Sequence, residues 1–96
     1  MLTGKQKRFL RSQAHHLDAI LHIGKGGVSE SLINQVRLAL EARELIKVSI
    51  LQNCEYDRHE VAEMLAEGAD AQLVQVLGKT VVLYRPSSNA KQIELP

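Results

Sequence analysis

The sequence has few of the residues that would indicate a disulfide-bonded, membrane or aromatic-stacking protein. Its 96 residues include one cysteine, two prolines, one phenylalanine, two tyrosines and no tryptophan. Cys54 alone cannot close an internal disulfide, which agrees with a reducing compartment. No apolar run approaches the roughly 18 residues of a membrane helix, and the N-terminal residues do not resemble a secretory signal. We therefore expect a cytoplasmic protein with no membrane partner.

The length suits one compact domain with a modest core. No repeat, low-complexity tract or linker interrupts the chain until Pro86, after which Ser87, Ser88 and Asn89 follow one another. The sequence predicts a folded domain over residues 1–86 and a polar C-terminal tail over residues 87–96 that frays.

The formal net charge is only +1, but the charges are unevenly distributed. Residues 1–27 contain five basic residues and one acidic residue, whereas residues 28–96 contain seven basic and ten acidic residues. A positive end is typical of a surface that faces a polyanion, although a charged helix is often only a solvated face.

Hydrophobic periodicity and turn residues predict three helices and four strands in the order αβαβαββ. Helices are expected after the N-caps Thr3, Ser29 and Asp57, the last with Glu60 in a capping box and with Gly68 as the C′ glycine. Strands are expected at residues 19–23, 45–51, 73–77 and 80–85, with a type II′ turn at Gly78-Lys79. The strand-helix-strand order predicts a parallel pair and the hairpin an antiparallel one, so the fold is α/β of the two-layer α+β type with a mixed sheet.

The helices are predicted to be amphipathic. In the first, Lys7 and Arg11 oppose an apolar side made of Leu2, Phe9, Leu10, Ala14 and Leu17. In the third, an acidic outer ridge opposes an apolar face; the ridge is Glu60, Glu63 and Glu67, and the face is Val61, Met64 and Leu65. Leu38 falls off the apolar stripe of the second helix and should be exposed.

The most informative segment is Gly24-Lys25-Gly26-Gly27, between the first strand and the second helix. Glycines let a phosphate approach the backbone closely, and amides at a helix start can receive an anion. A GxxG loop of this kind clamps single-stranded RNA in KH domains. A tight turn would also explain the glycines. The Walker pattern is absent, and the dinucleotide fingerprint has Ser29 where its last glycine should be.

The sequence gives little support for metal binding or catalysis. The four histidines and Cys54 lack the spacing of a zinc site, and no nucleophile-base arrangement is recognisable. We expect no enzyme, no metal, no cofactor and no small-molecule substrate. His15 should cap or pack the first helix, His22 should lie on the less buried sheet face, and either could touch RNA. The scarcity of aromatics favours backbone clamping over base stacking.

Five blocks of sequence taken together resemble the CRM family, whose bacterial single-domain members are YhbY-like. The resemblance covers residues 2 to about 85, and the blocks are Gly4-Lys5-Gln6-Lys7-Arg8-Phe9-Leu10-Arg11, Ala14-His15, Ile23-Gly24-Lys25-Gly26-Gly27, Glu44-Leu45-Ile46-Lys47-Val48 and Gly78-Lys79-Thr80-Val81-Val82-Leu83-Tyr84-Arg85. The family implies a four-stranded mixed sheet similar to the C-terminal domain of translation initiation factor three. It also implies RNA binding in the maturation of the large ribosomal subunit.

The resemblance places Gly24, Lys25 and Gly27 on the family's GKxG loop. With Gly26, these are our candidate RNA contacts, together with four cations of the basic first helix, Lys5, Lys7, Arg8 and Arg11. Two features depart from the family: Ala19 stands where many members have proline, and the total charge is near neutral.

The leading hypothesis is thus an RNA-binding protein that contacts ribosomal RNA of large-subunit precursors. The alternative is a protein-interaction module, in which the exposed sheet face or the Leu38 side of the second helix docks a ribosomal protein or assembly factor. In that case the basic helix would only steer the encounter.

Overall fold

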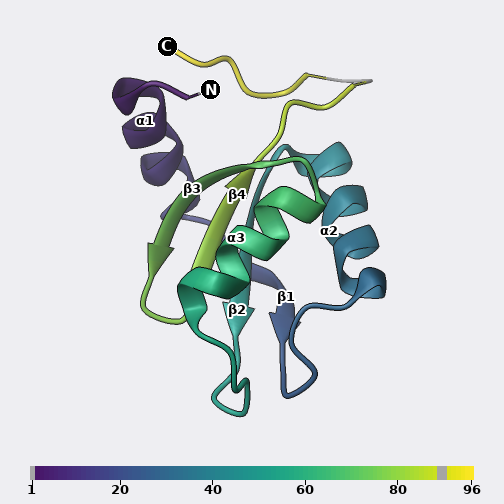
Figure 1. Ribbon diagram of the computed structural model, residues 1–96. Helices are drawn as coiled ribbons and strands as arrows, with labels where there is room; N and C mark the ends of the chain where they lie inside the picture. The colour runs from purple at the N-terminus through teal and green to yellow at the C-terminus, as the bar shows by residue number, and fades with distance from the viewer. Residues whose placement is uncertain (1, 89–90) are drawn as a thin grey trace.

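The computed structural model describes residues 2–88 and 91–96 and has the predicted order of elements (Figure 1). The described residues form three helices and four strands. Their bounds are α1 Gly4–Ala14, β1 Ala19–Ile23, α2 Glu30–Arg43, β2 Leu45–Ile50, α3 Arg58–Gly68, β3 Gln72–Leu77 and β4 Thr80–Tyr84. No helix in these two ranges has both the length and the apolarity to span a bilayer.

The strands form one mixed sheet in the order β1-β2-β4-β3. As predicted, β1 and β2 are parallel and β3 and β4 form an antiparallel hairpin, while β4 also pairs antiparallel with β2. Because β1, β2 and β3 run in the same direction, their C-terminal ends lie together at one edge of the sheet, at the bottom of Figure 1. We call this the loop edge; it comprises residues 24–27, 51–57 and 78–79.

The predicted helix starts are confirmed. Thr3 and Gln6 form a reciprocal capping box, with the Thr3 amide donating to Gln6 at 3.0 Å and the Gln6 amide donating to the Thr3 hydroxyl at 3.1 Å. The Ser29 hydroxyl accepts from the Leu32 amide at 3.1 Å. The Asp57 carboxylate accepts from the amides at positions 59 and 60, which is half of the predicted capping box.

The prediction for the end of α3 is wrong. Gly68 is the last helical residue, Ala69 is the C-cap, and Asp70 takes the left-handed conformation with φ 53°. The glycine instead serves the contact between α2 and α3, because a Cβ at Gly68 would lie 2.6 Å from Cδ1 of Ile33. At that distance Ile33 would have to shift before a side chain could be accommodated at position 68.

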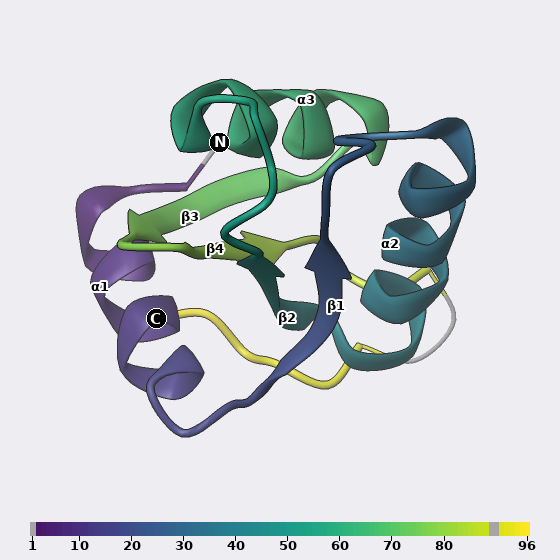
Figure 2. The ribbon, with the colours of Figure 1, turned by 90° about the horizontal axis from the view of Figure 1, so that it is seen from below.

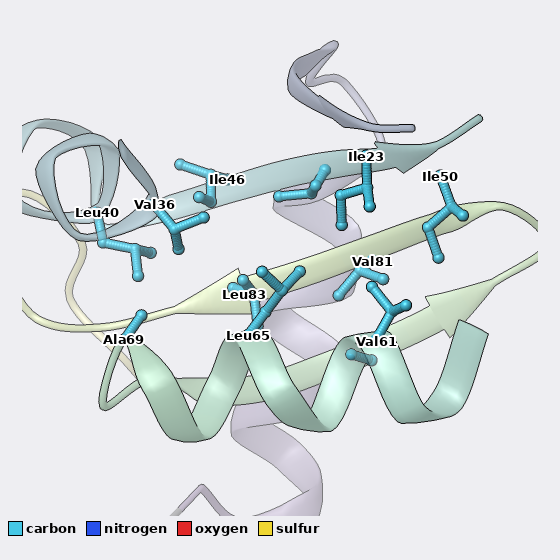
Figure 3. Close-up of a cluster of buried hydrophobic side chains, with 12 residues drawn as sticks. Ile23, Val36, Leu40, Ile46, Ile50, Val61, Leu65, Ala69, Val81 and Leu83 are labelled. Carbon is cyan, nitrogen blue, oxygen red and sulfur yellow. The ribbon is translucent and has the colours of Figure 1, made fainter. Parts of the chain in front are cut away.

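One face of the sheet is covered by α2 and α3 and holds the larger core (Figure 3). Alternate strand residues point into it, as the two-residue period of a strand requires. The buried cluster consists of Ile23, Val36, Leu40, Ile46, Val48, Ile50, Val61, Ala62, Leu65, Ala69, Val81 and Leu83. Met64 was predicted to belong to this face, but it borders the gap between α2 and α3 and is 45% exposed. Ala62 takes its place in the core.

The other face is covered by α1 over part of its area. Leu10 and Ala14 pack against a second, smaller cluster formed with Leu45, Val74, Val82 and Tyr84. Phe9 packs against this cluster, as predicted, and so do Leu2, Ile93 and Leu95. One expectation for α1 is wrong: Lys7 is half-buried, because its helical position adjoins that of Leu10 and Ala14.

Residues 91–96 of the C-terminal segment pack against the folded domain. The segment returns across the end of the sheet to α1 (Figure 1) and is held by Glu44, a fully buried residue with φ 64°. The Glu44 carboxylate accepts from the amides of Ser87, Gln92 and Ile93 at 2.6, 2.6 and 2.7 Å. Asn89, part of the predicted tail, lies outside the described residues.

These contacts determine the charge state of Glu44. Burial disfavours the charged form, but the amide hydrogen bonds, together with the charge of Lys91, outweigh burial and hold the pKa of the Glu44 carboxyl below its ordinary value of 4.5. Burial also raises the pKa of the Tyr84 phenol, and the charge of Glu44 adds to the effect. A charged Glu44 next to a neutral Tyr84 therefore anchors the segment.

Candidate nucleic-acid interface

The glycine loop is a tight turn closed by a hydrogen bond from the Gly27 amide to the Gly24 carbonyl at 3.1 Å. Gly27 has φ 67°, and a Cβ there would lie 2.6 Å from the ring of Tyr56. Gly26 is different, because its φ is not left-handed and a Cβ would meet nothing within 4 Å. Gly27 is thus needed for the turn itself, whereas Gly26 leaves open space over the backbone.

The backbone amides that are free to bind an anion lie in the glycine loop. The start of α2, which follows it, is less suited to an anion. At the start of α2 the Ser29 hydroxyl takes up one amide, and the Glu30 carboxylate lies in the first turn, where it opposes the binding of an anion. Lys25 and Gly26 are exposed, and within the described residues their amides donate to no other group. An anion at this point would meet Lys25 and two free amides.

The glycine loop is held by the neighbouring loop of the loop edge. The Leu51 amide donates to the Ile23 carbonyl at 2.8 Å, and Asn53 lies beside Gly24. Tyr56, whose ring covers Gly27, is still 51% exposed. Sequence analysis did not single out Tyr56; the available signal was an aromatic residue in a polar loop segment just before a helix cap.

The hairpin turn completes the loop edge. Gly78 has φ 57°, as the predicted type II′ turn requires. The Lys79 carbonyl accepts from the Ile50 amide at 2.7 Å, and the Arg58 guanidinium donates to the Gly78 carbonyl at 3.2 Å. Lys79 itself is exposed, so two exposed lysines, Lys25 and Lys79, lie on different loops of the same edge.

The predicted cations of α1 are open to solvent with one exception. Lys5, Arg8 and Arg11 are exposed and Lys7 is half-buried. None of the four side chains makes an ion pair or hydrogen bond with another residue of the described ranges. Unpaired cations on one helix are available to neutralise phosphates without first breaking contacts within the protein.

The structure does not place the two predicted contact sets side by side. Both views show α1 and the loop after β1 in different parts of the molecule, with the sheet between them (Figures 1 and 2). The acidic ridge of α3 lies on the opposite side of the sheet from α1, and Glu60, Glu63 and Glu67 are exposed as predicted. The negative charge of this ridge is therefore kept away from the basic helix.

The histidines and Cys54 form no metal site in the described part of the chain, where no group of three potential ligands is found. His15 caps the C-terminal end of α1 through its amide, and His22 is exposed, both as expected. The half-buried Cys54 contacts the Tyr56 carbonyl at 4.0 Å.

Comparison with known proteins decides the family. The model of the CRS1 / YhbY (CRM) domain matches residues 2–85. The chain belongs to this family. The match includes both predicted contact sets of this CRM domain, the glycine loop and α1.

Relatives with RNA-binding names cover the whole domain. The chain is 65% identical over 96 residues to "Probable RNA-binding protein YqeI" of Bacillus subtilis, with all of both chains covered. It is 37% identical over 95 residues to an "RNA-binding protein" of Haemophilus influenzae, covering 99% of this chain and 95% of the relative. The solution structure of hypothetical protein SAV1595 of Staphylococcus aureus, described as an RNA-binding candidate, has a TM-score of 0.84 and 56% identity, with 100% of both chains covered. The CRM fold predicted from the sequence is confirmed.

Proposed function

We propose that this CRM domain binds ribosomal RNA of large-subunit precursors in the cytoplasm and acts in ribosome biogenesis, with no catalytic step. The glycine loop and the basic α1 are the proposed contacts. The observation that carries the proposal is a set of five cations, together with the open amides of the loop; the side chains of Lys5, Lys7, Arg8, Arg11 and Lys25 have no partner among the residues that the structure describes. The RNA-binding names of the relatives support the same class of partner.

Contacts of this kind select the shape and backbone of an RNA more than its sequence, because they reach phosphate and ribose. If three to five phosphates are neutralised, log affinity should fall with log salt at a slope of roughly −2 to −4, at about −0.7 per single-strand phosphate. Measuring binding to large-subunit ribosomal RNA transcripts over a salt series tests this. A salt-independent affinity would contradict the proposal.

A pair of matched variants separates local contacts from total charge. Arg8→Gln removes one exposed cation of α1, and Arg37→Gln removes one exposed cation of α2, on the other side of the sheet. We expect the first variant to flatten the slope by about 0.7 and the second to leave it nearly unchanged. Equal effects would show that only net charge matters.

The loop is tested at Gly26, since the structure shows that replacing Gly27 would disturb the turn. Gly26→Val adds a side chain into open space and should weaken RNA binding by blocking the approach of a phosphate, with the unfolding free energy nearly unchanged. Crosslinking in cells, followed by sequencing of the bound RNA, identifies the target. Reads that do not concentrate on large-subunit ribosomal RNA would overturn the ribosomal part of the proposal.

One observation favours the alternative, in which the domain docks a ribosomal protein: the apolar side chain of Leu38 is 72% exposed. Leu38→Ser supplies the test, because it should not alter RNA binding but would abolish a protein contact at that side of α2. Association with pre-ribosomal particles that survives nuclease and is lost in Leu38→Ser would favour the alternative.

A further inference from the structure

The sheet face that α1 covers only in part carries two rows of side chains across neighbouring strands. Register places Ala19, Lys47, Val82 and Gln75 in one row and His22, Ser49, Thr80 and Leu77 in the next. The second row comes directly before the loop edge, because Ile23, Ile50 and Gly78 follow His22, Ser49 and Leu77 along the chain. The two rows thus connect the end of α1 with the loop edge.

Lys47 is the unusual member of these rows. It lies in the middle of β2, an interior strand of the sheet, and is half-buried. Its side chain forms no ion pair or hydrogen bond with another residue of ranges 2–88 and 91–96. A partly desolvated cation without a counter-charge is unfavourable for folding alone, so a ligand of opposite charge would explain its presence.

A cleft lies between the last turn of α1 and these rows. Its volume is about 100 Å³, and it is lined by Arg11, Ala14, His15, Lys47, Gln75, Leu77, Thr80 and Val82. The lining contains no carboxylate. Arg11 and Lys47 line the cleft together with the buried, apolar Val82. Thr80 and Gln75 add a hydroxyl and an amide to the lining.

We infer that this cleft is a binding site for one nucleotide of a single-stranded RNA segment that runs from α1 to the loop edge. Arg11 and Lys47 bind its phosphate through charge-assisted hydrogen bonds, and Gln75 and Thr80 contact the adjoining ribose or base edge. The inference rests on the proposed RNA binding and adds a location. A strand that touches both α1 and the glycine loop has to cross the sheet between them (Figure 2). The second row, which lies next to the loop edge, has no member in the smaller core under α1.

The decisive variant is Lys47→Met, which keeps an unbranched stem and removes the charge. Lys91→Gln, an exposed lysine of the C-terminal segment, is the matched control. For binding of a short single-stranded oligoribonucleotide at low salt, Lys47→Met should lower the affinity roughly tenfold, as expected for one lost charged hydrogen bond. It should also flatten the salt slope by about 0.7, and the control should change neither quantity.

A structural role for Lys47 makes a different prediction. If the lysine mattered only for folding, Lys47→Met would reduce the unfolding free energy, whereas the binding site requires this free energy to be unchanged or higher. Gln75→Ala, on the edge strand β3, tests the cleft without touching Lys47 and should weaken oligonucleotide binding several-fold. The amide resonances of Gln75 and Thr80 should shift during the RNA titration.

The results distinguish this inference from the proposed function. If the unmodified protein shows no salt-dependent RNA binding, the proposed function itself fails. If it binds normally, and Lys47→Met and Gln75→Ala bind equally well, the cleft is not a nucleotide site although the protein binds RNA.

Discussion

The two faces of the sheet are built from the same strands and differ in almost every other respect. On the face covered by α2 and α3, β2 contributes Ile46, Val48 and Ile50, all buried. On the other face, the intervening Lys47 and Ser49 are half-buried and α1 covers only part of the area. Because successive residues of a strand point to opposite sides, stability and ligand binding can be encoded by alternate positions of one strand. A change on one face should leave the property of the other intact.

The largest expected effect comes from the covered face. Leu65→Ala removes a fully buried side chain from the larger core and should lower the unfolding free energy by about 2–5 kcal/mol. Thr80→Ala, on the open face, should change it by no more than about 0.5 kcal/mol. Guanidinium unfolding of both variants measures the contrast, and similar losses at the two sites would show that the open face also carries the fold.

An intermediate effect is expected at the glycine loop. Gly27→Ala forces a left-handed alanine against the ring of Tyr56 and should reduce the unfolding free energy by about 1–3 kcal/mol. Gly26→Ala fits the backbone and meets nothing within 4 Å, so it should be neutral or slightly stabilising. Thermal unfolding of the two variants compares them. If Gly26→Ala were the more damaging change, our division of roles within the loop would be wrong.

A similar or smaller effect is expected where the C-terminal segment meets Glu44. Glu44→Gln directs an amide donor toward backbone donors and should cost about 1–3 kcal/mol of unfolding free energy, whereas the exposed Glu94→Gln should cost little.

The pKa of the Glu44 carboxyl is lowered in the folded protein. Its contribution is therefore complete above the ordinary value of 4.5 and is lost as pH falls through the folded pKa. Unfolding measured against pH should show this loss below about pH 4.5 for the unmodified protein and not for Glu44→Gln.

Local signals in the sequence were sufficient for the elements and their order. Helix starts at Thr3, Ser29 and Asp57 were predictable because a cap involves residues only two or three positions apart. The turn at Gly78-Lys79 was predictable for the same reason. At Met64 and Gly68 the sequence pattern was not enough, because the neighbouring helix α2 decides which side of α3 is covered and where a side chain is excluded.

The candidate site was predictable only in its contiguous parts. The glycine loop and the cations of α1 stand together in the sequence, and whether they contact RNA stays a prediction. The cleft depends on Lys47, Gln75 and Thr80, which become neighbours through strand register. Glu44 resembles an ordinary surface acid at the end of an amphipathic helix. Its burial depends on a segment more than 40 positions away.

The contact between Tyr56 and Gly27 also gives the protein an optical reporter. The chain has no tryptophan, so its near-ultraviolet emission comes from two tyrosines. Tyr84 is buried near Glu44 in the smaller core, whereas Tyr56 is half-exposed and its ring lies against Gly27 of the glycine loop. Emission that is accessible to a quencher therefore comes mainly from Tyr56, and occupation of the glycine loop can be followed by fluorescence without attaching a dye.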